Sequence, residues 1–163
     1  MSCAGIPDLA RTIANPRLLL TAANRPAVPA PLAEQYPLGL GQTVHEVRNA
    51  AEGAQVLPKM HFSCMEEPAF VDAFRARGRK QAVIAGMEAH ICVVHTAKSR
   101  VEDGFDVFVV SDATASRTLE SERACLGRLS ASGVGIVTAE MVVSEWLGRA
   151  GTPAFKELLP LIK

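Results

Sequence analysis

This sequence has no excess of positive or negative charge. Its 17 lysine and arginine residues balance 17 aspartate and glutamate residues, so the formal net charge is zero. No block of basic residues stands out, and we expect neither a nucleic acid partner nor attraction to an anionic membrane. The longest apolar runs, residues 91–94 and 107–110, are far too short to cross a bilayer. The first residues have no basic start followed by a long apolar stretch, which predicts no secretion signal and a cytoplasmic location.

Closely spaced cysteines are also absent. The four cysteines, Cys3, Cys64, Cys92 and Cys125, contain no CxxC pair and no zinc-type cluster. In a chain without a secretion signal, the expected state of these thiols is reduced. The glycines near residues 39–41 make no phosphate-binding loop, because the lysine and the serine or threonine of such a loop are missing. We therefore predict no cofactor, and we expect at least one thiol to be free for chemistry.

The remaining composition is that of a globular domain. The chain has 163 residues, of which 48% are hydrophobic and 21% charged, and this is enough to bury a core. From residue 55 onward, short apolar runs alternate with segments of helical periodicity. The expected strands are residues 81–86, 106–110 and 133–137, and the expected helices are residues 67–77, 91–101, 119–129 and 139–147. This alternation predicts parallel strands in a three-layer α/β domain, with residues 1–163 forming a single domain.

The first third of the chain follows a different pattern. Residues 9–23 have helical composition interrupted by Pro16, and three further prolines follow within residues 26–31. Residues 27–33 are expected to form an edge strand, since proline cannot donate a hydrogen bond inside a sheet. Residues 36–41 are expected to be a turn-rich loop. The first helix and the following strand are thus predicted to be shortened.

Cys92 lies where a buried strand gives way to a helix. The strand ends near Gly86, and Cys92 falls in the first turn of the helix that follows. Ligands of open parallel sheets bind outside the carboxyl ends of the strands. A helix N-terminus favours a thiolate, and its free N–H groups can stabilise an oxyanion. The alternative, a small buried cysteine with a packing role, is equally compatible with this position.

Lys59 is expected near the same edge of the sheet. It follows the short apolar segment of Val56 and Leu57, which predicts a second strand ending close to Lys59. A lysine at the mouth of the sheet would favour a thiolate and stabilise negative charge on a tetrahedral intermediate. A solvated surface lysine is the alternative interpretation of the same residue.

Four segments of the sequence form a series with defined order and spacing. They read Glu34-Gln35-Tyr36-Pro37 with Gly39-Leu40-Gly41, then Lys59-x-x-Phe62-Ser63, then Gly86-Met87-Glu88-Ala89-His90-x-Cys92-Val93, and finally Ser111-Asp112-Ala113. Together they resemble the isochorismatase-like hydrolase family, especially its isochorismatase-domain-containing subgroup. The resemblance extends from about residue 27 to the C-terminus, where Thr138-Ala139-Glu140-Met141 and Pro153-x-Phe155-Lys156 also match.

The resemblance implies a fold, a site and an assembly. The fold is a Rossmann-like three-layer α/β/α sandwich with a mostly parallel sheet. The site is a cysteine–lysine–aspartate triad, whose nucleophile maps onto Cys92 and whose lysine maps onto Lys59. The family also implies homo-oligomers, dimers or larger, and a non-proline cis peptide between Met87 and Glu88. Four residues of the matched motifs are expected to bind substrate: Met87, Glu88, Tyr36 and Phe62.

The third member of the triad does not match. The family has an aspartate at the end of its first strand, and the corresponding position here falls near Ala4. Asp8 is the one early carboxylate, and a helix N-terminal acid is its favoured interpretation. The family aspartate serves as the general base, so deacylation without it would be slower by roughly 10²–10⁴-fold.

Four histidines and further cysteines are other candidates for the site. His90 and His95 are five residues apart, so they do not share a helix face as paired metal ligands do. The nicotinamidases, relatives that bind a metal, have an Asp-x-His spacing that residues 33–36 lack. We therefore predict no metal. His61 is expected at the pocket edge or the surface, and Cys64 and Cys125 are expected to be structural.

The sequence thus predicts a metal-independent hydrolase. It would act through a Cys92 thioester on a small-molecule substrate with an amide, a related C–N bond or an ester. The alternative is a catalytically impaired isochorismatase-like fold that serves as an oligomeric or partner-binding scaffold. A third hypothesis, a redox-responsive thiol protein, would require a resolving cysteine near Cys92.

Overall fold

The computed structural model describes residues 6–162, and every paired strand in it runs parallel to its neighbour. The strands are β1 (Leu32–Gln35), β2 (Val56–Lys59), β3 (Gln81–Met87), β4 (Asp106–Ala115) and β5 (Gly135–Val137). The helices are α1 (Leu9–Ala23), α2 (Pro37–Leu40), α3 (His45–Ala50), α4 (Pro68–Arg75), α5 (Val94–Glu102), α6 (Leu119–Ala131), α7 (Ala139–Leu147) and α8 (Pro153–Ile162). A 3₁₀ turn, η1 (Cys64–Glu66), precedes α4, and a π-helical turn, η2 (Ala89–Val93), precedes α5.

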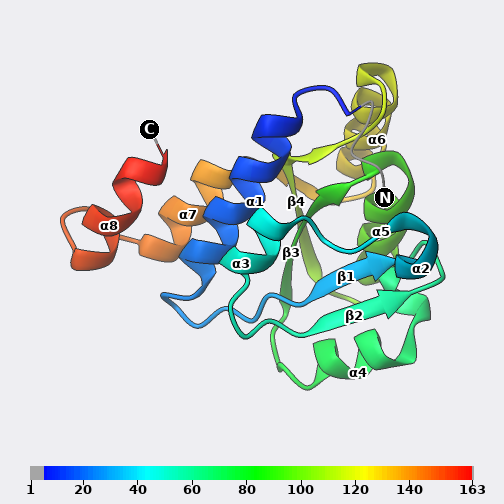
Figure 1. The fold of residues 1–163 in the computed structure, drawn as a ribbon, viewed down its shortest axis with the longest axis horizontal. Coiled ribbons are helices and arrows are strands. Elements are labelled where there is room, and N and C mark those ends of the chain that lie inside the picture. The colour runs from blue at the N-terminus through cyan, green and yellow to red at the C-terminus, as the bar shows by residue number, and fades with distance from the viewer. Residues whose placement is uncertain (1–5, 163) are drawn as a thin grey trace.

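The strands form two separate sheets. In the larger sheet, β4 lies between β3 and β5, and Val109 stands opposite Ile84 of β3 and Ile136 of β5. The smaller sheet consists of β1 and β2, with Gln35 opposite Lys59 at its carboxyl end. Figure 1 shows the β1–β2 pair set apart from β3 and β4. The predicted parallel α/β architecture is confirmed, but its sheet is divided between β1 and β3.

Helices cover both faces of the larger sheet, and β4 connects the two cores. On one face, Val110 packs with apolar residues of α1, α7 and α8, among them Leu19 and Val143. On the other face, Val109 packs with η2, α5 and α6, where Leu129 is completely buried. Successive residues of a strand point to opposite faces, so a single strand can support both layers. Figure 1 shows α1 and α7 on one side of β4, with α5 and α6 on the other.

The first third of the chain differs from its prediction in three respects. Within the turn-rich loop expected over residues 36–41, Pro37–Leu40 form the short helix α2. Helix α1 runs without a break through Pro16, although proline removes one backbone hydrogen bond inside a helix. The strand expected over residues 27–33 begins later, at Leu32, and ends at Gln35. Pro29 and Pro31 lack the N–H groups that a ladder requires, which explains why pairing with β2 starts beyond them.

The turn between β3 and the following helix also differs. The described residues include no cis peptide bond, so the cis bond expected between Met87 and Glu88 is not found. Glu88 instead adopts a left-handed conformation, with φ 56° and ψ 51°, which reverses the chain direction. The helix expected over residues 91–101 begins at Ala89 with the π-helical turn and continues as α5. In the part of the chain that the structure describes, no helix combines the length and apolar character needed to span a membrane.

Candidate functional site

Three strand ends bring the site together. Gln35 is the last residue of β1, Lys59 the last of β2, and β3 ends five residues before Cys92. Because β1 and β2 are parallel and in register, Gln35 and Lys59 occupy the same carboxyl edge. The turn at Glu88 directs Cys92 toward this edge. The arrangement agrees with the rule that sites of open parallel sheets form beyond the carboxyl ends of their strands.

Cys92 has two polar neighbours. Its Sγ lies 3.6 Å from Nζ of Lys59 and 3.7 Å from Oε1 of Gln35. The side chain is partly exposed and lines a large cavity. The expected approach of Lys59 to Cys92 is therefore confirmed. Their catalytic roles remain predictions.

The backbone N–H groups of the π-helical turn η2 are not free, in contrast to the expectation that they could stabilise an oxyanion. The N–H groups of Ile91 and Cys92 both donate to the carbonyl oxygen of Glu88, at 2.8 and 3.0 Å. The N–H of His90 points to the Ser116 hydroxyl at 3.4 Å. These groups were expected to be free for an oxyanion, and they are already engaged within the fold. Positive charge beside Cys92 comes instead from the Lys59 side chain.

Lys59 is a buried cation surrounded by neutral acceptors. Its side chain is 5% exposed. Nζ donates to Oε1 of Gln35 and to the carbonyl oxygens of His61 and Phe62, each carbonyl at 2.9 Å. These three bonds use the three protons of the ammonium group. Within residues 6–162, no carboxylate pairs with Lys59, so Cys92 is the neighbour that can carry a compensating negative charge.

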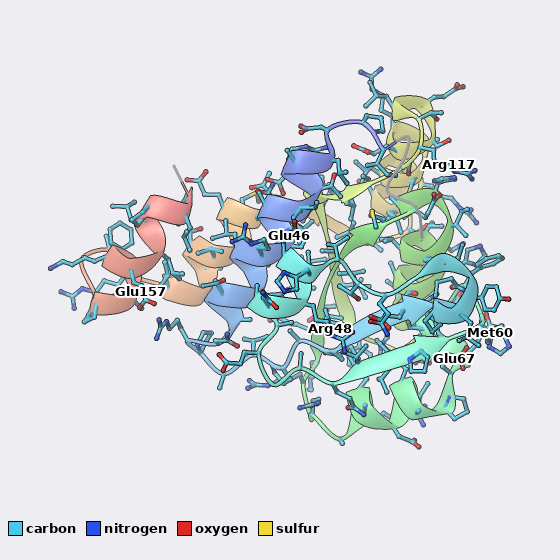
Figure 2. All side chains as sticks on the ribbon, in the orientation of Figure 1. Glu46, Arg48, Met60, Glu67, Arg117 and Glu157 are labelled. Atoms are coloured by element: carbon cyan, nitrogen blue, oxygen red, sulfur yellow. The ribbon has the colours of Figure 1, made fainter. Side chains whose placement is uncertain are left out.

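The loop after β2 is held in place by Glu67. One of its carboxylate oxygens accepts from the backbone N–H of Met60 at 2.7 Å and of His61 at 3.0 Å. The same oxygen lies 2.9 Å from Nδ1 of His61. Hydrogen bonds from the His61 and Met60 backbone lower the pKa of Glu67 to about 2. Figure 2 shows Met60 and Glu67 at the same end of the β1–β2 sheet. Glu67 thereby fixes the loop whose carbonyl groups hold Lys59.

Gln35 is a site residue that the sequence analysis did not identify. Its amide oxygen accepts from Lys59, and its amide nitrogen donates to the carbonyl of Met60 at 2.7 Å. Both contacts agree with one orientation of the amide group. A signal existed in the sequence, because Gln35 lies inside the first matched motif, two residues after the strand predicted over residues 27–33. Without the pairing of β1 with β2, however, nothing placed it opposite Lys59.

The residues expected to bind substrate are spread over the site. Met87 lines the cavity together with Lys59 and Cys92. Glu88 is buried, and its carboxylate lies 3.3 Å from Nε of Arg117, so its contacts point away from Cys92 toward the α6 side. The other two are exposed and do not line the cavity: Tyr36, at the start of α2, and Phe62, in the loop that holds Lys59.

Two further carboxylates, those of Asp8 and Asp112, have structural contacts. Asp8 caps α1, where it accepts from the backbone N–H of Arg11 at 3.2 Å and pairs with the Arg11 side chain. This confirms the favoured interpretation of Asp8 as a helix N-terminal acid. Asp112 accepts from the N–H of Ala139 at 2.8 Å, at the start of α7. The position that corresponds to the family aspartate, near Ala4, lies outside the described residues.

The other described thiols are poorly placed for ionisation. Burial raises the pKa of Cys64 and raises that of Cys125 to about 11. The Cys125 thiol donates to the carbonyl of Ala89 at 3.0 Å. Both belong to apolar cores, which confirms their structural interpretation. Cys3 lies outside the described residues.

The described histidines do not converge on a metal site. His61 pairs with Glu67, and Nδ1 of His90 lies 2.9 Å from the Ser116 hydroxyl. The His95 ring lies near Phe62, with centroids 6.4 Å apart. Among residues 6–162, no group of three or more histidine, cysteine or acidic side chains is arranged to hold an ion.

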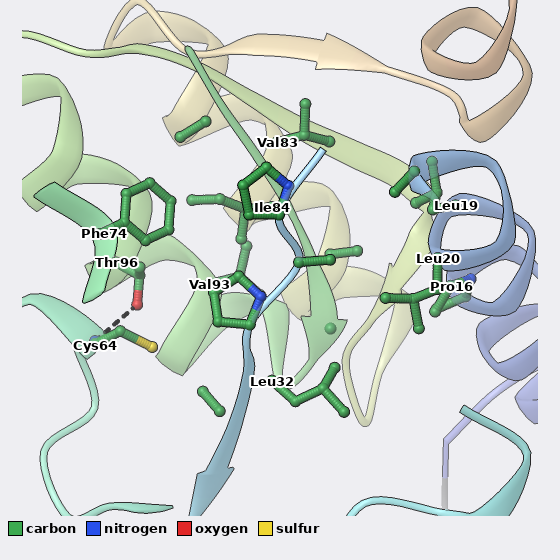
Figure 3. Close-up of a pocket in the computed structure, with 18 of the residues that line it drawn as sticks. Pro16, Leu19, Leu20, Leu32, Cys64, Phe74, Val83, Ile84, Val93 and Thr96 are labelled. Carbon is green, nitrogen blue, oxygen red and sulfur yellow. Dashed lines mark hydrogen bonds between the residues drawn. The ribbon is translucent and has the colours of Figure 1, made fainter. Parts of the chain in front are cut away.

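A cavity of about 1000 Å³ opens beside the thiol. Figure 3 shows apolar side chains of β1, β3, α1, α4 and η2 around it, together with Thr96 of α5. Cys92, Lys59 and Gln35 lie among the lining residues, so these three side chains face a mostly apolar cavity. A pocket of this kind suits a small molecule with a few polar groups.

The fold and the site place the chain in the class of parallel α/β proteins that carry a thiol and a buried lysine at the carboxyl edge of their strands. The match to a family model narrows this class. The model of the isochorismatase domain matches residues 3–141, and the chain therefore belongs to the isochorismatase family. The resemblance drawn from the four motifs is confirmed.

Relatives and solved structures agree with this assignment. Isochorismatase domain-containing protein 2 of Macaca fascicularis is 38% identical over 146 residues, which cover 89% of this chain and 69% of that protein. Isochorismatase domain-containing protein 1 of Salmo salar is 33% identical over 145 residues, again 89% of this chain. The chain spans about half the length of that relative and of its Danio rerio counterpart, 51% in each case.

Similar solved structures cover almost the whole chain. The MAR1 ribonuclease of Caenorhabditis elegans has a TM-score of 0.90 and 31% identity, covering 98% of this chain and 82% of its own. YcaC of Pseudomonas aeruginosa, solved with hexane-2,5-diol and covalent acrylamide, has a TM-score of 0.88 and 26% identity, covering 97% and 81%. YcaC of Escherichia coli, described as an octameric hydrolase of unknown specificity, has a TM-score of 0.87 and 26% identity, covering 97% and 82%.

Iodoacetamide provides a test of the thiol site. At neutral pH we expect Cys92 to be alkylated well before Cys64 and Cys125, because the latter are buried and their pKa values are raised. Replacing Lys59 with Met removes the cation and should slow Cys92 labelling at least tenfold. Peptide mass spectrometry gives the rate at each site, and Lys98→Met is the matched control. Equal Cys92 rates in the two variants would contradict the proposed influence of Lys59.

The Glu67 contacts predict a dependence on acid. Its pKa is lower in the folded chain than its ordinary value of 4.5, so its contribution to folding is present above about pH 4.5 and is lost as the pH falls toward 2. Glu67→Ala should loosen the loop that holds Lys59 and slow Cys92 labelling, whereas Glu67→Gln keeps an acceptor and should lie between. Urea unfolding at several pH values should show the wild-type advantage over Glu67→Ala shrinking with acidity. A constant advantage down to about pH 2 would contradict this.

Proposed function

We propose that the chain is a hydrolase that acts on a small amide, a related C–N bond or an ester through Cys92. The observation that carries the proposal is the buried Lys59 ammonium, which lies 3.6 Å from Sγ and has no carboxylate partner among the described residues. In a poorly hydrated site an unpaired cation stabilises an adjacent anion strongly. Ionisation of the Cys92 thiol supplies that anion and at the same time the nucleophile.

The proposed reaction has two steps. The Cys92 thiolate forms a bond to the carbonyl carbon, and the negative charge moves to the carbonyl oxygen of a tetrahedral intermediate. That intermediate collapses to a thioester as the C–N or C–O bond breaks, and the leaving group takes a proton from the solvent, which received one when the thiol ionised. Water then adds to the thioester, releasing the carboxylic acid and restoring the thiol. Lys59 supplies positive charge throughout, and Gln35 positions it through the amide oxygen.

Two of the solved structures support this chemistry by similarity. The Pseudomonas aeruginosa neighbour holds covalent acrylamide, and the Escherichia coli neighbour is described as a hydrolase. The Caenorhabditis elegans neighbour is named a ribonuclease. A thiol beside an ammonium suits attack on a carbonyl, whereas phosphodiester cleavage calls for a paired general acid and base. We therefore propose a carbonyl substrate, contacted at the cavity mouth by Met87 with Tyr36, Phe62 and Glu88 nearby.

The second step lacks a visible base. In the described part of the chain, no carboxylate oxygen is hydrogen-bonded to Cys92, whose polar contacts are Lys59 and Gln35. A lysine whose three protons are already donated cannot accept one from water. Acylation and hydrolysis are thus expected to differ in rate. The same observation favours the second candidate function, a catalytically impaired fold that binds a partner or assembles as a scaffold.

An activated ester separates these possibilities. With p-nitrophenyl acetate we expect a burst of about one p-nitrophenol per chain, followed by turnover slower by roughly 10²-fold or more. Stopped-flow absorbance measures the burst, and mass spectrometry identifies the acyl group on Cys92. The Cys92→Ala variant should lose the burst, while Cys125→Ala should keep it.

Two other outcomes of this experiment would lead to different conclusions. Rapid turnover without a burst would mean that a base not identified among the described contacts assists hydrolysis. Absence of any acylation by esters or amides, in a protein that still folds, would contradict the hydrolase proposal and leave the scaffold.

We also propose a homo-oligomer. The Escherichia coli neighbour is octameric, and this chain exposes large apolar side chains in two segments that follow β1 and β2: Leu38, which is 96% exposed, and Met60 and Phe62. Apolar patches of this kind commonly mark interfaces. Multi-angle light scattering at micromolar concentration should give at least a dimer, and Leu38→Asp should lower the mass. Leu119→Asp, at an exposed position on α6, is the control. A monomer mass at all concentrations would contradict the proposal.

A further inference from the structure

A second thiol, that of Cys64, lines the same cavity as Cys92. Both cysteines are free thiols, and Thr96 lines the cavity with them. Figure 3 shows Cys64 joined to Thr96 by a hydrogen bond at the edge of the cavity. The hydrolysis proposed above uses Cys92 and gives no role to Cys64. One wall of the cavity therefore carries a thiol whose chemistry is unassigned.

Hydrogen bonds hold the start of η1 against the helix that carries Cys92. The backbone N–H of Cys64 donates to Oγ1 of Thr96 at 3.1 Å. Beside this bond, the Ser63 hydroxyl lies 3.2 Å from the Ser99 hydroxyl. Thr96 follows Cys92 by four residues, and side chains at this spacing lie on one face of a helix. Cys64 is thus fixed one helical turn from Cys92, along the same face.

Lys59 connects the same two segments. Its Nζ donates to the carbonyl oxygens of His61 and Phe62 at 2.9 Å, and these residues belong to the loop that leads into η1. The same Nζ lies 3.6 Å from Sγ of Cys92. The relative position of Cys64 and Cys92 therefore depends on contacts between η1, its preceding loop and the helix. It does not depend on what occupies the cavity.

The Cys64 thiol responds to the charges of this site. Burial is the main cause that raises its pKa, while a hydrogen bond with the Thr96 side chain and the positive charge of Lys59 lower it. A negative charge on Cys92 raises it further. Oxidation of Cys92 to a neutral sulfenic acid removes this last contribution and leaves Lys59 in place, so the pKa of Cys64 falls. Oxidation of one thiol thereby makes the other a better nucleophile.

We propose that Cys64 is the resolving thiol of Cys92, and that a hydroperoxide converts the pair into a reversible disulfide. In the first step the Cys92 thiolate attacks one oxygen of the hydroperoxide and the O–O bond breaks. The leaving oxygen takes a proton from the solvent and departs as water or an alcohol, and Cys92 becomes a sulfenic acid. In the second step the Cys64 sulfur bonds to the Cys92 sulfur as the S–O bond breaks, and the Cys64 proton leaves with that oxygen as water.

The disulfide has a geometric requirement and a chemical consequence. An S–S bond of about 2.05 Å requires both thiol side chains to rotate toward each other and η1, which is three residues long, to shift against the helix. The bond protects Cys92 from irreversible oxidation to a sulfinic acid, and a dithiol reductant restores both thiols. It also removes the nucleophile of the proposed hydrolysis. The inference goes beyond that function and requires only a reactive Cys92.

Peptide mapping tests the proposal on the intact chain. The reduced protein is treated with hydrogen peroxide at neutral pH, remaining thiols are blocked with iodoacetamide, and a tryptic digest is analysed without reduction. We expect the tryptic peptides 60–75 and 81–98 to be joined by a disulfide, with a mass loss of about 2 Da in the intact chain. Dithiothreitol should separate the peptides and restore Cys92 labelling. A mixture of isotope-labelled and unlabelled protein should show that the bond forms within one chain.

Matched variants separate the two steps. Cys64→Ser should abolish the bond and leave Cys92 as a sulfenic acid, which dimedone traps, and later as a sulfinic acid. Thr96→Val removes the hydroxyl that holds Cys64, so it should slow disulfide formation about tenfold without changing the rate at which sulfenic acid forms. Cys125→Ser is the control and should behave as the wild type. If a variant fails to fold, the peptide map of the unmodified chain still decides the question.

Three results would overturn the proposal: oxidation of wild-type Cys92 straight to a sulfinic acid, a disulfide from Cys92 to Cys3 or Cys125, or a bond that forms only between chains. The outcome for the hydrolase is separate. The expected disulfide in a protein that no ester or amide acylates would count against the hydrolase alone. A burst of acylation without the disulfide would count against the resolving role of Cys64 alone.

Discussion

The buried ammonium of Lys59 is the constraint on which the site depends. Burial of a cation is costly unless its protons are donated, and all three are. The acceptors come from the end of β1 and from the loop after β2, so satisfying one charge fixes two segments. Glu67 extends this order by holding the same loop through two backbone N–H groups. The position of Lys59 beside Cys92 is therefore a consequence of the hydrogen bonds that make its burial tolerable.

The division of the sheet shapes the cavity and its charge. With β1 and β3 unpaired toward each other, the space between α1 and α5 is filled by no strand from residues 6–162, and Arg100 retains unused N–H groups. The reactive end of this space holds positive charge without a carboxylate. The open space and the positive charge of Lys59 therefore lie at the same carboxyl edge of the strands.

Local patterns in the sequence were sufficient for most elements and for the pair of reactive residues. The apolar run before Gly86 and the helical period after it predicted where Cys92 would lie, because such signals come from neighbours in the chain. Gln35 and the division of the sheet were not predictable in this way, since both depend on which strands pair across long sequence separations. The engaged N–H groups of Ile91 and Cys92 were also missed, because the sequence does not distinguish a π-helical turn from an α-helical one. The left-handed backbone conformation of Glu88 was not predicted for a related reason, because glutamate is not a residue type that indicates a turn.

The electrostatics of the site favour the acylation step of a hydrolysis over the hydrolysis of the thioester. A fixed cation stabilises the thiolate and the oxyanion that follows it, and both arise during acylation. Hydrolysis of the thioester needs in addition a group that removes a proton from water, and a fully donated ammonium cannot do this. A site with Lys59 and Gln35 but no hydrogen-bonded carboxylate is therefore better suited to forming an acyl-enzyme than to releasing it.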